Sequence, residues 1–197
     1  MTLRLWTLPT AALVLAGVLV LPTPANAQAI GIHGGVSSSE YKFETPAPST
    51  SPLWGGAAGV FVLLGEGMFG GLVEANWVRK GTELSGGTQI KVDYLEIPIA
   101  GRLVFGAGQD FSIHALFGGT IAFKLNTSQS GAPFIVDLDE DIDAFDHGIL
   151  VGGGIEYQKL IVSGRYNWGT RDVSDRPDEF YNRGWTFLVG YKLVGGQ

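Results

Sequence analysis

Hydrophobic and polar positions alternate along most of the chain that follows residue 28. The clearest stretch is Lys91–Phe105, in which Leu95 and Ile97 share one parity and Glu96 and Arg102 share the other. A period of two positions places successive side chains on opposite faces of a β-strand. The pattern therefore predicts a strand with one apolar face and one charged face.

The same alternation recurs in six further segments. These are Ala29–Ser37, Leu72–Val78, Phe111–Lys124, Asp146–Tyr157, Leu160–Trp168 and Trp185–Leu193. Ala57–Leu64 is apolar at both parities, so the pattern leaves its inward face unassigned. Together these segments predict eight strands.

The distribution of charge between the two faces indicates which face meets water and which meets lipid. The polar face carries four acids and four bases, which are Glu74, Glu96, Asp146, Glu156, Arg102, Lys124, Arg165 and Lys192. The apolar face of the same strands carries no charge and is rich in aromatic residues toward the strand ends. A soluble sandwich turns its charged face to water, whereas a membrane barrel turns its apolar face to lipid. We expect the eight charges to form a paired network inside a barrel.

The connections also alternate. Four are long and polar, namely Ser38–Leu53, Arg79–Gln89, Leu125–Ala144 and Gly169–Asn182. Three are short, namely Gly65–Met68, Gly106–Asp110 and Gln158–Lys159. Long outer loops and short periplasmic turns are typical of outer-membrane barrels, and lipid tolerates no unpaired strand edge. The predicted fold is all-β, an eight-stranded antiparallel up-and-down transmembrane β-barrel.

Residues 1–27 have the features of a secretory signal peptide. Arg4 precedes the uncharged segment Leu5–Leu21, and an Ala-x-Ala site ends at Ala27. The rival interpretation is a retained membrane anchor, but the apolar run is short, contains Pro9 and ends in a cleavage box. We expect cleavage after Ala27, which leaves residues 28–197 as one barrel domain.

Several segments resemble the outer-membrane protein β-barrel domain family, which includes porin-like and PorT-like proteins. Leu72–Gly81 followed by Tyr94–Pro98 is similar to two neighbouring strands of that family. Asp146–Glu156 and Arg165–Gly169 are similar to later strands, and the likeness extends over most of Gln28–Leu193. The resemblance implies a location in the bacterial outer membrane and a barrel architecture, and it implies no reaction.

Composition excludes several classes of protein. The chain of 197 residues has a formal charge of −6, and nucleic-acid binders normally carry a basic stripe. Cysteine is absent, which removes disulfides, thiolate metal sites and cysteine nucleophiles. We expect neither a cofactor nor a metal.

The interior charges have two interpretations. The first is an ion path or a ligand site. The second is a structural network that fills a narrow lumen. We favour the second, because eight strands leave room only for side chains or one small ligand.

A Ser-His-Glu esterase built from His33 or His114 with Ser112 or Ser163 is disfavoured, because its triad would have to face lipid. The acidic run Asp137–Asp143 lacks the glycine and the final glutamate of an EF-hand, which leaves weak divalent binding or a solvated loop.

The expected role is structural or interactive, with outer-membrane lipid, lipopolysaccharide and the barrel-assembly machinery as partners. The chain ends in Gln197 rather than in the aromatic residue usual for such barrels. A narrow porin-like channel and a soluble periplasmic barrel that binds an apolar ligand are the alternative functions.

Pro98 has no backbone N–H to donate to the strand ladder, so we expect a local bulge or a water there.

Overall fold

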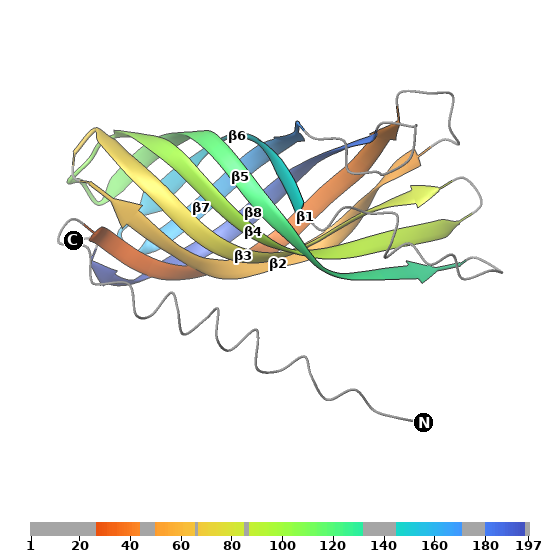
Figure 1. Cartoon of the computed structure of the whole chain (residues 1–197). Coiled ribbons are helices and arrows are strands. Elements are labelled where there is room, and N and C mark those ends of the chain that lie inside the picture. The colour runs from red at the N-terminus through yellow and green to blue at the C-terminus, as the bar shows by residue number, and fades with distance from the viewer. Residues whose placement is uncertain are drawn as a thin grey trace.

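The computed structural model describes residues 27–43, 50–65, 67–84, 87–131, 145–170 and 180–195. These residues form eight strands that pair in chain order and close on themselves, each antiparallel to its neighbours (Figure 1). The strands are β1 (Ala27–Phe43), β2 (Thr50–Leu64), β3 (Phe69–Leu84), β4 (Thr88–Phe105), β5 (Phe111–Ser130), β6 (Phe145–Tyr157), β7 (Leu160–Gly169) and β8 (Phe180–Gly195). The predicted eight-stranded up-and-down barrel is confirmed. No helix among the described residues is long and apolar enough to cross a membrane.

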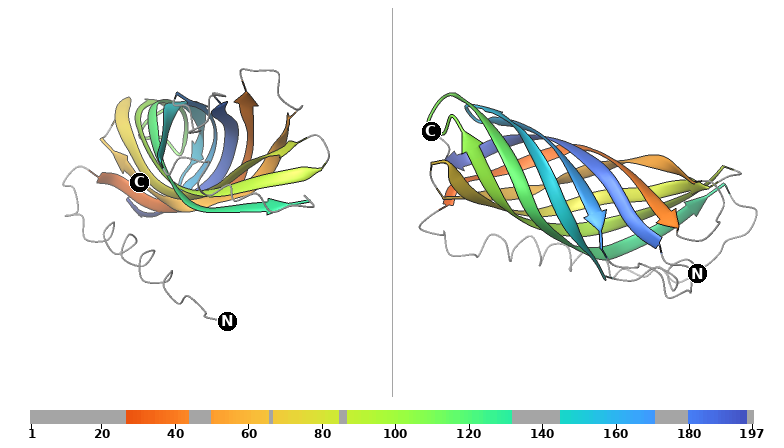
Figure 2. Two further views of the ribbon diagram at one scale, coloured as in Figure 1. Left: turned by 45° about the vertical axis from the view of Figure 1, so that its right-hand side comes forward. Right: turned by 90° about the horizontal axis from the view of Figure 1, so that it is seen from above.

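The strands are inclined to the barrel axis by an amount that their register fixes. A path of paired residues that starts at Ile30 and passes once around the wall returns to β1 at Glu40, ten residues further along. Eight gaps of about 4.8 Å and ten rises of about 3.3 Å imply a tilt of about 40°. Figure 2 shows this oblique winding from above.

The two faces of the wall have the composition that the alternation predicts. On β4, Ile99 is 55% exposed on the outside, whereas Glu96 and Arg102 are 2% and 6% exposed on the inside. Phe117 of β5 is 69% exposed and pairs with the outward-facing Gly101. The structure also assigns the ambiguous β2, because Phe61, like Ala57 and Leu63, is buried in the lumen. The predicted parity is confirmed.

The outward apolar band has the height of a bilayer core. On β4 it extends from Leu95 to Phe105, and ten residues at a tilt of about 40° span about 25 Å. Aromatic side chains border the band at both ends. The outer border holds Trp77, Tyr166, Trp168 and Trp185, and the inner border holds Phe69, Phe105, Phe111 and Tyr157. Beyond the outer border, Arg79 on β3 and Asp93 on β4 form an outward-facing ion pair.

The strands run further than the sequence pattern predicts. Ladder pairs continue through most of the segment that was expected to be the loop Arg79–Gln89, up to Leu84 and Thr88. Likewise, β4 pairs with β5 as far as Ser130, whereas β6 pairs with β5 only as far as Phe123. The expected loop boundaries were wrong because a strand outside the bilayer carries polar residues on both faces, which removes the alternation.

Pro98 does not shift the register of β4. It pairs with Thr120 of β5, and on the other side the pairing passes from Val73↔Ile99 to Asn76↔Glu96 in unchanged register. The expected bulge is therefore absent at this position. The bulge between β4 and β5 lies instead at Asp93/Tyr94, above the bilayer band.

Candidate functional site

The lumen contains nearly all of the charged side chains that the alternation placed on the polar face. Seven of the eight are at most 8% exposed, namely Glu74, Glu96, Arg102, Asp146, Glu156, Arg165 and Lys192. Lys124 of β5 is half-buried. The register places these side chains at three heights along the barrel axis.

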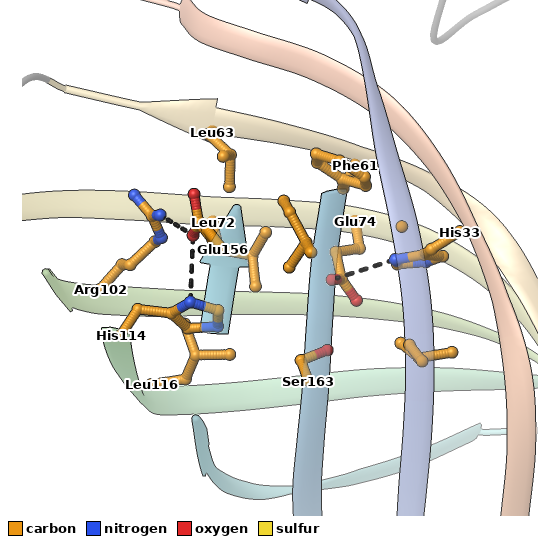
Figure 3. A pocket seen from close by; sticks show the side chains of 13 residues that line it. His33, Phe61, Leu63, Leu72, Glu74, Arg102, His114, Leu116, Glu156 and Ser163 are labelled. Carbon is orange, nitrogen blue, oxygen red and sulfur yellow. Dashed lines mark hydrogen bonds and ion pairs between the residues drawn. The ribbon is translucent and has the colours of Figure 1, made fainter. Parts of the chain in front are cut away.

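The cluster nearest the short turns is centred on Glu156 of β6. One oxygen of this carboxylate, Oε1, accepts a hydrogen bond from Arg102 of β4 and lies 3.0 Å from His114 Nδ1 of β5. The other oxygen, Oε2, lies 2.9 Å from Lys192 Nζ of β8. Three strands thus send a nitrogen group to one carboxylate, as Figure 3 shows for Arg102 and His114.

The middle cluster is centred on Glu74 of β3. Arg165 of β7 donates to Glu74 Oε2, and Asn76 Nδ2 donates to the same oxygen over 2.7 Å. The amide oxygen of Asn76 lies 2.6 Å from His33 Nε2, and His33 Nδ1 lies 3.8 Å from Glu74 Oε1. These four residues come from β1, β3 and β7, so the cluster connects opposite sides of the wall.

The outer cluster contains a residue that the sequence analysis missed. Lys80 Nζ of β3 lies 2.5 Å from Glu96 Oε1 and 5.7 Å from the centre of the Tyr94 ring. Lys80, Glu96, Asp146 and Asn167 line a cavity of about 10 Å³. Lys80 was assigned to a loop, although the even parity of Glu74 and Asn76 continues to it.

An apolar layer separates the Glu156 and Glu74 clusters. Phe61, Leu63, Leu72 and Leu116 are each at most 5% exposed and line one cavity of about 30 Å³ (Figure 3). A cavity of this size holds about two water molecules. Glu74 and Glu156 also line this cavity, so it reaches both clusters, but its volume is too small for a hydrated ion to pass.

A larger cavity of about 500 Å³ lies below the Glu156 cluster, at the end of the barrel that carries the short turns. It is bordered by the turns 106–110 and 158–159, and Arg102, Glu156 and Lys192 line its inner side. Lys159 lies beside Lys192, because the Lys192 amide donates to the Lys159 carbonyl over 2.9 Å. We call this cavity the vestibule.

The structure gives little support to the esterase alternative. His114 faces Glu156, and His33 faces Asn76 and Glu74. Within the described residues no hydrogen bond joins Ser112 or Ser163 to either histidine, and no group of His, Asp and Glu side chains is arranged to hold a metal ion. The acidic run Asp137–Asp143 lies outside the described residues. The same holds for residues 1–26, so cleavage after Ala27 stays a prediction.

Known structures of small outer-membrane barrels are similar to this chain. Ail, the attachment invasion locus protein of Yersinia pestis, is 13% identical with a TM-score of 0.44, and the match covers 83% of this chain and 97% of Ail. Neisserial surface protein A is 12% identical with a TM-score of 0.47, at the same coverage. The N-terminal β-barrel domain of Pseudomonas aeruginosa OprF is 6% identical with a TM-score of 0.34, and the match covers 84% of this chain and 99% of that domain. A comparison with curated proteins gives no match.

The family comparison agrees with the parity of the wall. Residues 24–175 match the family described as outer membrane protein beta-barrel domain, which covers more than half of the chain. The uncharged outer band and the enclosed charges are what such a location requires. The chain belongs to the outer membrane protein beta-barrel domain family and is an integral protein of the bacterial outer membrane.

Proposed function

We propose that the protein is a closed barrel that anchors surface-exposed loops in the outer membrane and does not conduct solutes. The observation that carries this proposal is the filling of the lumen. Arg165 and Glu74 join opposite walls, and the layer that contains Phe61 lies directly beneath them. The side chains between the two ends leave room for water molecules only.

The part of the barrel beyond the bilayer supports a role in surface interaction. Arg79 donates to both oxygens of Asp93, over 2.7 and 3.0 Å, and Gln89 donates to Glu83 over 3.0 Å. These pairs bind β3 to β4 outside the membrane and keep the hairpin ordered in water. A rigid, polar extension of this kind suits the presentation of loops to lipopolysaccharide or to an external partner.

A soluble barrel that binds an apolar ligand does not fit this wall. Phe117, Ile99 and Val189 are all more than half exposed, and exposed apolar patches of this extent are not stable in water. A catalytic role has no support in the lumen, where both histidines already face carboxylate or amide partners. The narrow channel therefore stays as the competing function.

Conductance across a planar bilayer distinguishes the two functions. Wild-type protein that is shown to be folded by its heat-dependent gel shift should give no current steps at any salt concentration. A double variant, Phe61→Ala with Arg165→Ala, removes the widest apolar side chain and the crossing cation together, so it serves as a matched, opened control. Steps from the wild type that equal those of this variant would contradict the closed lumen.

We also infer that the chain is exported as a precursor and inserted by the barrel-assembly machinery. The support is the apolar segment Leu5–Leu21, the Ala-x-Ala site that ends at Ala27, and the start of β1 at that same residue. The intact mass of the protein purified from outer membranes should correspond to a first residue of Gln28. A mass that includes Leu5–Leu21 would show a retained anchor instead.

A further inference from the structure

The ion pairs of Glu74 and of Glu96 contain one obligate cation each, whereas those of Glu156 contain two. Glu74 has one cationic partner, Arg165, and Glu96 has Lys80. Glu156 has two, Arg102 and Lys192, and both Glu74 and Glu156 face a histidine in addition. The Glu156 cluster therefore contains one more obligate cation than it contains carboxylates.

An unneutralised buried cation is costly, because a low-dielectric surrounding does not screen its charge. Arg102, Lys192 and Glu156 are 6%, 8% and 4% exposed, so the excess positive charge is held away from bulk water. The same three residues line the inner side of the vestibule. The excess positive charge therefore lies next to a cavity that opens toward the short turns.

We propose that the vestibule binds a small oxyanion, of the phosphate or carboxylate class, as the counter-ion of this cluster. The guanidinium of Arg102 has five N–H donors, and Glu156 occupies only some of them. The ammonium of Lys192 has three donors, of which Glu156 Oε2 takes one. Planar or tetrahedral oxyanions match these groups through charge-assisted hydrogen bonds.

The rim of the vestibule adds one charge of each sign. Lys159 is next to Lys192 and is exposed, so it attracts anions toward the opening. Asp110 lies on the same rim and repels them, but it is also exposed, and water screens its effect. The buried pair of cations, rather than the rim, determines the affinity.

Binding is measured on the full-length mature protein, folded in an uncharged detergent that contains no phosphate. Sodium phosphate and sodium acetate are titrated separately at constant ionic strength, with sodium chloride as the balance. Backbone amide shifts are followed by NMR. We expect saturable shifts at the turns 106–110 and 158–159 and at Lys192, in the millimolar range. Saturation by phosphate alone assigns a phosphate site, and saturation by acetate as well assigns a general oxyanion site.

Lys192→Met restores a one-to-one ratio of cation to acid and should weaken oxyanion binding about tenfold or more. Lys80→Met removes a buried cation from the other end of the lumen and should leave binding unchanged. Lys159→Gln changes an exposed side chain in a turn and should weaken binding about two- to threefold. The absence of saturable shifts in the wild type, or equal affinities of wild type and Lys192→Met, would overturn the proposal. Because conductance is not part of this readout, the site and the closed lumen succeed or fail separately.

Discussion

The guanidinium of Arg165 on β7 binds the carboxylate of Glu74 on β3, four strands away in a wall of eight. The two residues therefore face each other across the full width of the lumen. Both side chains are at most 5% exposed. This contact, together with the apolar layer around Phe61, makes the interior a packed core rather than a pore.

Removal of one partner from this pair should destabilise the barrel. Glu74→Gln leaves the Arg165 charge buried without its carboxylate, and we expect the free energy of unfolding to fall by about 3–5 kcal/mol. Urea unfolding in lipid vesicles, followed by tryptophan fluorescence, measures the change.

A double replacement tests whether the loss of stability comes from an unpaired buried charge. Glu74→Leu combined with Arg165→Met removes both charges and keeps most of the volume, so stability should return to within about 1 kcal/mol of wild type. Asp93→Asn breaks an ion pair that is partly in water and should cost less than about 1 kcal/mol. Equal losses of stability in Glu74→Gln and Asp93→Asn would show that the buried Glu74–Arg165 pair stabilises the barrel no more than a partly exposed pair does.

Two adjacent glycines of β1 test the packing of the wall. A Cβ on the inward-facing Gly35 would lie 1.8 Å from the Phe187 carbonyl oxygen, whereas a Cβ on the outward-facing Gly34 would have no neighbour closer than 3.8 Å. Gly35→Ala should therefore lower stability by about 1–3 kcal/mol, and Gly34→Ala should be neutral or slightly stabilising. The same unfolding assay decides, and comparable effects of both changes would argue against the assigned faces.

The lipid-facing band predicts a dependence on depth. Phe117 lies within the band and is 69% exposed, whereas Leu125 lies beyond it on the same strand and is 57% exposed. Phe117→Arg should cost about 2–4 kcal/mol in a bilayer, and Leu125→Arg about 0–1 kcal/mol. A penalty at Leu125 as large as that at Phe117 would move the boundary of the membrane outward.

The alternation seen at Leu95, Glu96 and Ile97, repeated along the chain, predicted the fold and the inward position of the charges, because the bilayer excludes charged side chains from the outer face of each strand. Above the bilayer both faces carry polar residues, which is why Lys80 and the strand around it were assigned to a loop. The partners of each charge could not be predicted either. Glu74 and Arg165 meet because of the register offset accumulated around the whole barrel, which the sequence of a single strand does not determine.

The chain contains no cysteine, so single cysteines can test the orientation of the wall directly. Cysteines are placed one at a time at Ile97, Pro98, Ile99 and Ala100 of β4, labelled with a nitroxide in the unfolded state because a thiol reacts as its thiolate, and the protein is then folded into lipid vesicles. Electron paramagnetic resonance measures the collision of each nitroxide with dissolved oxygen, which concentrates in the bilayer. The orientation described above predicts high oxygen accessibility at positions 97 and 99 and low accessibility at 98 and 100. The opposite alternation, or equal accessibility at all four positions, would contradict it.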